Sequence, residues 1–176
     1  MALRRYGQDC SIARALEVVG ERWTLLIVRN AMVGDCRFES LLDSLGIARN
    51  VLAQRLTTLV EAGVLERVPY RERPVRHEYR LTERGRELAP VLAALMRWGE
   101  KNCPTDQPPP NRALVHARCE HPVELVVHCP SCDESIPTSE MVSRPVVRSA
   151  VETDDPQPSA DERPPAVLAA TVPGVR

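Results

Sequence analysis

Apolar residues recur at every third or fourth position through most of the first hundred residues, the pattern of helices that each bury one face. It predicts helices at 11–19, 21–33, 37–45, 48–62 and 82–102. We expect Ser11 and Thr82 to cap the first and last helices, and a glycine to end each of the first four. Pro90 should kink the last helix or divide it into two segments.

The period changes to two after Gly63. Residues 64–70 and 77–81 are predicted strands, joined by an Arg-rich loop at 71–76. Pro69 lacks the N–H that an interior strand needs, so the pair should form an isolated ribbon. Two short helices around a glycine turn, followed by such a ribbon, predict a winged helix-turn-helix, a mainly α fold with a small β-ribbon (α+β).

The helix predicted at 48–62 would enter the major groove of DNA. Leu52, Leu56 and Leu59 share its inner face, which turns polar residues outward. Arg, Asn and Gln can form paired hydrogen bonds with base edges, and arginines of the ribbon could follow the phosphates or the minor groove. The same layout also suits a protein-interaction module without DNA binding, because Arg-rich loops are often only solvated. The candidate DNA-binding residues are Arg49, Asn50, Gln54, Arg55 and Thr57 on this helix and Arg71, Arg73 and Arg76 in the ribbon loop.

Several short motifs follow one another between residue 10 and about residue 100. They are CSIARAL (10–16), GERWTLLI (20–27), RFESL (37–41), VLAQRL (51–56), GVLER (63–67), PVRHEYRLT (74–82) and Gly85. In this order they resemble the HxlR-type winged-helix transcriptional regulators of bacteria, relatives of the MarR type. The resemblance implies a homodimer held by the first and last helices, and a repressor or activator of nearby genes. The chain departs from the family pattern at Ser11 (usually Pro), at Glu21-Arg22 (Gly-Lys) and at Ala48 (often Ser).

Composition separates the front of the chain from the back. The first hundred residues carry 16 arginines against 13 acidic residues and all six aromatic residues, whereas 13 of the 16 prolines follow residue 100. The back part therefore lacks what a packed core needs. We predict a DNA-binding and dimerisation domain at 1–103, a Pro-rich linker at 104–112, a Cys/His module at 113–137 and a disordered tail at 138–176.

No apolar run approaches the length of about 18 residues that a membrane helix needs, and no signal-peptide pattern opens the chain. We therefore expect a cytoplasmic protein with reduced cysteines. Cys10 precedes the first helix, where the helix dipole and Arg14 would favour the thiolate. In some members of the resembled family a cysteine at this place senses oxidants or electrophiles. Cys10 is thus either a redox sensor, with an oxidant or small molecule as effector, or a half-buried structural thiol.

A second constellation comprises His116, Cys119, Cys129 and Cys132, two ligand pairs each separated by two residues. This spacing predicts one structural zinc ion, with a short hairpin at 123–127 between the pairs. Glu120 and Asp133 stand where such turns usually carry glycine, so a metal-free tail is the alternative. A thiol–disulfide protein using Cys129 and Cys132 is a further alternative, but no βαβ pattern surrounds the pair. The sequence also has no phosphate-binding loop, acid–base carboxylate pair or nucleophile elbow, so we expect a regulator and not an enzyme.

Overall fold

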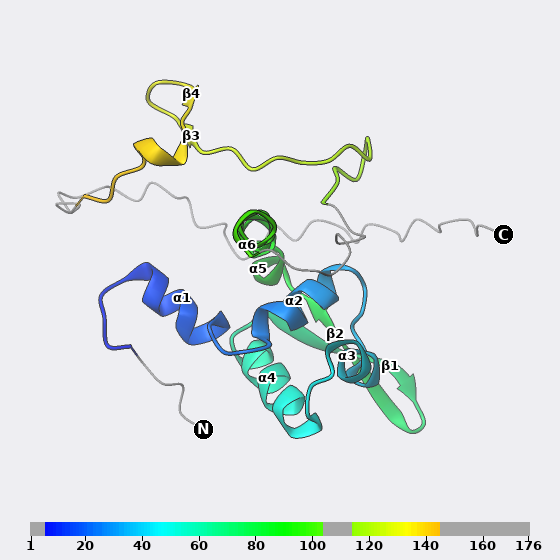
Figure 1. Cartoon of the computed structure of the whole chain (residues 1–176). Helices are drawn as coiled ribbons and strands as arrows, with labels where there is room; N and C mark the ends of the chain where they lie inside the picture. The colour runs from blue at the N-terminus through cyan, green and yellow to red at the C-terminus, as the bar shows by residue number, and fades with distance from the viewer. Residues whose placement is uncertain (1–5, 104–113, 145–176) are drawn as a thin grey trace, which may run out of the picture. The chain divides into compact units, whose positions relative to one another are not determined.

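The structure is a computed structural model of the chain, and it describes residues 6–103 and 114–144. Two compact units form, residues 1–127 and 128–176, so the first unit extends beyond the predicted boundary at 103. The predicted linker at 104–112 lies outside the described residues, as does most of the predicted tail. The first unit is a winged helix-turn-helix, which confirms the predicted fold (Figure 1). Its elements are α1 (Ser11–Val19), α2 (Thr24–Met32), α3 (Phe38–Leu45), α4 (Arg49–Glu61), β1 (Leu65–Glu72), β2 (Val75–Leu81), α5 (Glu83–Arg86) and α6 (Ala89–Asn102).

The core of this unit lies where α2, α3 and α4 meet the start of the ribbon. Its fully buried side chains include Ile27, Leu41, Leu52, Leu56, Leu59 and Leu65. The three leucines of α4 recur at helical spacing, as predicted, and their burial fixes which face of α4 turns outward. Within the described residues no helix is long and apolar enough to cross a membrane.

Two helices begin differently from the prediction. Cys10 is the N-cap of α1 and Ser11 its first residue, and the Ser11 hydroxyl accepts from the Arg14 guanidinium at 2.9 Å instead of capping the helix. Helix α2 begins at Thr24, three residues later than predicted. The reason is Trp23, whose backbone has a left-handed φ of 79° that a right-handed helix cannot include.

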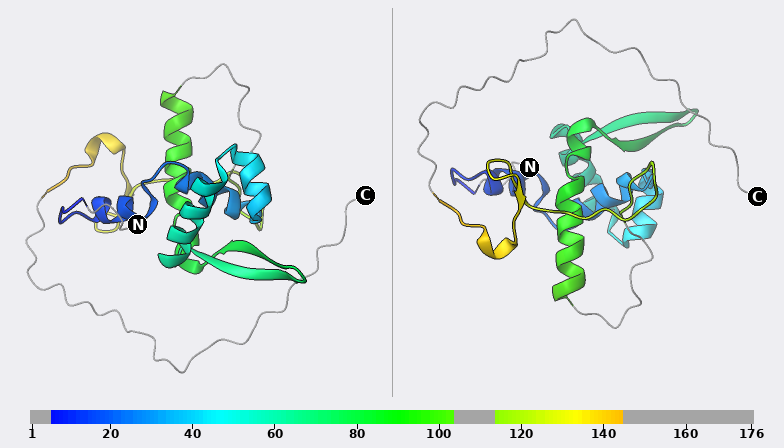
Figure 2. Two further views of the ribbon diagram at one scale, coloured as in Figure 1. Left: turned by 90° about the horizontal axis from the view of Figure 1, so that it is seen from below. Right: turned by 90° about the horizontal axis from the view of Figure 1, so that it is seen from above.

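The ribbon is longer and its turn tighter than predicted. Strands β1 and β2 pair antiparallel up to Glu72 opposite Val75, so only Arg73 and Pro74 remain in the turn. The six-residue loop is therefore wrong, because residues on both sides of the turn continue the ladder. One irregularity follows Pro69, which has no N–H to give to a ladder. The two strands form a sheet of their own, as predicted, and it projects from the helices (Figure 2).

The last helical stretch is divided into two segments, as predicted, with the break just before Pro90: α5 ends at Arg86 and α6 begins at Ala89. Thr82 caps α5: its hydroxyl accepts from the Gly85 N–H at 3.1 Å and donates to the carbonyl oxygen of Gly63 at 2.6 Å. Gly85 packs so tightly that an added Cβ would lie 2.2 Å from the carbonyl oxygen of Val64. Helix α6 then starts with Pro90 in its first turn, where a missing N–H costs nothing.

The second unit contains β3 (His128–Cys129), β4 (Glu134–Ser135) and the 3-10 helix η1 (Thr138–Glu140). Strands β3 and β4 pair antiparallel and close a turn around the second Cys pair. The hairpin predicted at 123–127 is wrong, because this range carries no strand. In the first unit, a separate bridge between Val115 and Pro122 closes the turn that holds His116 and Cys119.

Candidate nucleic-acid interface

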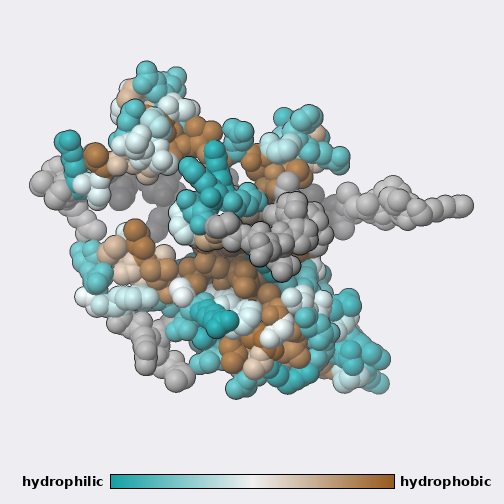
Figure 3. Space-filling model, viewed as in Figure 1, coloured by the Kyte–Doolittle hydropathy of each residue, from teal (hydrophilic) through white to brown (hydrophobic). Residues whose placement is uncertain are grey.

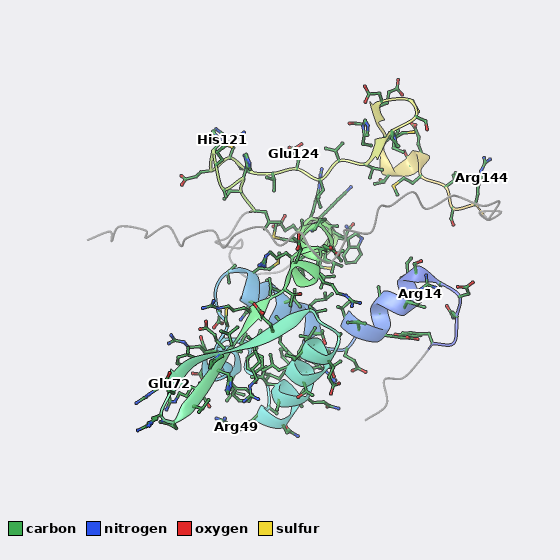
Figure 4. All side chains as sticks on the ribbon, turned by 180° about the vertical axis from the view of Figure 1, so that it is seen from behind. Arg14, Arg49, Glu72, His121, Glu124 and Arg144 are labelled. Carbon is green, nitrogen blue, oxygen red and sulfur yellow. The ribbon has the colours of Figure 1, made fainter. Side chains whose placement is uncertain are left out.

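Helix α4 carries the predicted base-reading residues on the face opposite its buried leucines. Arg49, Asn50, Gln54 and Thr57 are all exposed. The Thr57 hydroxyl donates to the carbonyl oxygen of Ala53 at 3.0 Å, so its proton is already engaged within the helix. The side chains with several donors therefore lie on the first two turns of α4, and Figure 4 shows Arg49 at its N-terminal end.

Arg49 is held by the preceding helix. Its Nη1 and Nη2 donate to Oε1 and Oε2 of Glu39 at 2.9 and 2.8 Å, and its guanidinium lies 5.3 Å from the centre of the Phe38 ring. These hydrogen bonds are the main reason that the pKa of Glu39 is lowered and the pKa of Arg49 is raised. Because both side chains are exposed, the pair adds little to stability. Its effect is to fix the direction of Arg49.

The structure corrects the prediction for Arg55. Its side chain is only 17% exposed and donates to Glu21 at 2.8 Å and to the carbonyl oxygen of Arg22 at 3.3 Å. Arg55 therefore ties α4 to the segment before α2 and does not belong to the outward face. The sequence contained the signal, because position 55 follows Leu52 by three residues and precedes Leu59 by four, which places it beside the inner face.

The arginines of the ribbon gather at its free end. Arg73 lies in the turn, and Arg71 and Arg76 stand opposite each other in the ladder. Like charges in that arrangement repel unless an anion lies between them, and none of the three arginines forms an ion pair with another described residue. In both views of Figure 2 the end of the ribbon and α4 project on the same side of α6. Arg76 comes near enough to Glu39 to help lower the pKa of that carboxyl group.

A second exposed surface is apolar. Val91, Leu95 and Trp98 recur along α6 at spacings of four and three, and Ile12 and Leu16 are exposed on α1. Trp98 is 60% exposed in the single chain, whereas Trp23 packs against the core. Figure 3 shows apolar residues over α1 and across the middle of the same view.

Cys10 lies half-buried and is itself the N-cap of α1, the place that the prediction gave to Ser11. The guanidinium of Arg14 is also near the start of this helix, but it donates to Asp9 at 3.1 Å and to Ser11. Its positive charge is therefore shared with a carboxylate.

The structure brings together each predicted ligand pair. In the first unit, Nδ1 of His116 lies 3.1 Å from Sγ of Cys119. In the second, Sγ of Cys132 donates to Sγ of Cys129 at 3.2 Å, and this hydrogen bond is the main reason that the pKa of Cys129 is lowered. The residues in place of the usual glycines, Glu120 and Asp133, have φ values of 58° and 57°, the conformation that glycine favours. Three or more potential ligands do not gather anywhere in the described part of the chain.

Comparison with known proteins connects these features. The model of the family "HxlR-like helix-turn-helix" matches residues 18–107. The uncharacterized HTH-type transcriptional regulator Rv3095 of Mycobacterium tuberculosis is 46% identical over 135 residues, 77% of this chain and 85% of the relative. The solved structure of PA1607, a candidate transcription factor, is 39% identical, has a TM-score of 0.67, and aligns over 79% of this chain and 97% of its own. The redox regulator HypR in its oxidized form is 30% identical, with a TM-score of 0.51, over 55% of this chain and 100% of its own.

Proposed function

Because this chain belongs to the HxlR-like helix-turn-helix family and is a DNA-binding transcriptional regulator, not an enzyme, we propose that it binds a near-palindromic duplex as a homodimer in the cytoplasm and represses genes next to its own. The observation that carries the proposal is that α4 and the free end of the ribbon project on the same side of α6. Arg49 and Asn50 on that side suit base edges, and the clustered arginines of the ribbon suit phosphates.

The exposed apolar residues of α6 and α1 support the homodimer. A helix that exposes Val91, Leu95 and Trp98 on one stripe gains by covering them, and a second copy of the chain offers the matching stripe. A two-fold dimer would place two copies of α4 about 34–36 Å apart, one turn of DNA, and this spacing requires a near-palindromic operator.

The roles of the arginines can be separated by experiment. We expect Arg49→Ala to cost about 1–3 kcal/mol and to relax base preference at one position of a selected binding motif. Arg73→Ala should weaken all sequences alike and reduce the salt slope by about one. Arg84→Ala, which removes an exposed arginine from α5, is the charge-matched control and should change neither.

The measurement is fluorescence anisotropy with the chain's own upstream region, between about 50 and 200 mM salt. Wild-type affinity should fall steeply with salt, and selection experiments should return two half-sites. Salt-independent or undetectable binding would overturn the proposal and favour a protein-interaction module. An Arg49→Ala motif identical to that of wild type would show that α4 lies differently in the groove.

We also propose that oxidants or electrophiles act through Cys10. The position of Cys10 at the N-cap of α1, where the helix dipole favours a thiolate, supports this, together with the likeness to a redox regulator. Diamide or a quinone should release wild-type protein from its operator but leave Cys10→Ser bound. Wild-type binding that survives both reagents would contradict a sensing role.

The Cys/His segment is proposed to bind one structural zinc ion through His116, Cys119, Cys129 and Cys132. Support comes from their spacing and from the tight turn within each pair. Protein purified without added metal should contain about one zinc per chain, and the double variant C129S/C132S should contain much less. Less than about a tenth of an equivalent in wild type would leave this segment metal-free.

A further inference from the structure

Glu39 is an exposed carboxylate at the end of the first unit that we assign to DNA. A negative charge there repels phosphates, and an exposed ion pair contributes little to folding. Neither stability nor general DNA affinity therefore accounts for this residue. What the structure shows is that Glu39 controls the orientation of Arg49, the first residue of α4.

The geometry leaves a defined part of Arg49 available. Glu39 accepts one N–H from each of Nη1 and Nη2, so it engages the far end of the guanidinium. The group has five N–H donors, and the Nε–H with the outer N–H of a neighbouring Nη forms a second, parallel pair on its side. Such a pair fits N7 and O6 of guanine. The Phe38 ring, 5.3 Å away, restricts rotation of the same group.

We propose that Glu39 is a positioning and specificity-determining residue that holds Arg49 so that the side edge of its guanidinium reads a guanine of the operator. The inference rests on the proposed function, since it requires α4 in the major groove. A free arginine could swing to any nearby phosphate, which would give affinity without sequence choice. Because Glu39 accepts from Nη1 and Nη2 at the end of the guanidinium, the contact of the side edge with guanine becomes more favourable than a contact with a nearby phosphate.

The chain offers a matched control in Asp43, also exposed on α3. Its charge acts on Arg49 through space, whereas Glu39 bonds directly to it. Glu39→Gln and Asp43→Asn each remove one negative charge, so both should raise affinity for non-operator DNA. Only Glu39→Gln should lower the preference for the operator over a duplex with that guanine replaced. We expect a loss of about fivefold or more, the lower end of what one bidentate contact provides.

Three outcomes decide the matter, with thermal melting confirming that each variant is folded. The inference is supported if Glu39→Gln lowers the preference for the operator and Asp43→Asn does not. In addition, adding Glu39→Gln to Arg49→Ala should cause no further loss of preference. Equal preference in the two single variants overturns it, while wild-type DNA binding leaves the proposed function intact. Absence of salt-dependent duplex binding by the wild type overturns both.

Discussion

Asn30 is a buried polar residue near the end of α2, and its replacement by alanine tests how the helix-turn-helix is held together. The side chain is 5% exposed. Its Nδ2 donates to Oδ2 of Asp35 at 3.0 Å and to the Ser44 hydroxyl at 2.8 Å, while its Oδ1 accepts from Nε and Nη2 of Arg29 at 3.1 and 2.8 Å. Because Ser44 lies on α3, this amide joins α2 to the first helix of the motif.

The cost follows from the groups left behind. Alanine would remove the amide donor from the Asp35 carboxylate, whose Oδ1 is already buried without a partner among the described residues. The Ser44 hydroxyl would still donate to Oδ2 at 2.8 Å but would lose the amide as its own donor. Losing a hydrogen bond to a charged group costs about 1.5–3 kcal/mol and a neutral one about 0.5–1.5 kcal/mol. We therefore expect Asn30→Ala to lower the free energy of unfolding by about 2–4 kcal/mol.

Urea unfolding followed by circular dichroism at neutral pH measures this difference. Asn102→Ala is the matched control, because Asn102 is exposed and its amide donates, among the described residues, to the carbonyl oxygen of Trp98 at 2.9 Å. The control should change stability by less than about 0.5 kcal/mol. If the two variants lose the same free energy of unfolding, the buried network does not join α2 to α3.

The remaining predictions concern other buried groups of the first unit. The Thr24 hydroxyl is buried with no partner among the described residues, so Thr24→Val should raise the free energy of unfolding by about 0.5–2 kcal/mol; a loss in urea unfolding would reveal a hidden partner. Gly85→Ala would place a methyl group against the carbonyl oxygen of Val64 and should lower the free energy of unfolding by about 1–3 kcal/mol or more. The measurement is a lower melting temperature, and an unchanged one would mean that the backbone shifts to make room for the methyl group. Burial is the main reason that the pKa of the Cys36 thiol is raised above its ordinary value of 9.0. The contribution of the protonated Cys36 thiol to the free energy of unfolding is therefore complete below that pH and declines as pH rises through the folded pKa. Alkylation at alkaline pH should be slower at Cys36 than at the exposed Cys103, and equal rates would contradict this.

Helical spacing predicted the inner face of α4 because a buried residue leaves a periodic trace in the sequence. Leu52, Leu56 and Leu59 repeat at intervals that admit only one inward face. The same arithmetic, applied to Arg55, would have placed that residue beside the core, and its ion pair with Glu21 follows from that position. The start of α2 is different, since nothing in the residue type of Trp23 indicates a left-handed backbone.

In the ribbon, the residue types alone did not predict where the strands end and the turn begins. Residues 71–76, four of them charged, have the composition of a loop, yet most of them continue the strands, because a projecting ribbon is solvated on both faces and needs no apolar alternation. Residue type could not separate a charged strand from a charged turn. Backbone pairing decides this, and it places Arg71 opposite Arg76 instead of leaving both in an open loop.

The orientation of Arg49 depends on a different kind of information. Its position at the start of α4 follows from the sequence, but the direction of its guanidinium is set by Glu39, ten residues earlier across the turn of the motif. A position on the outward face of a helix indicates that a side chain can reach DNA, but it does not indicate where the donors of that side chain point. Base recognition requires a donor pair at a fixed place, so sequence choice at this surface depends on the neighbours of Arg49 as much as on Arg49 itself. Two chains with the same residues on α4 and different residues at position 39 should therefore prefer different operators.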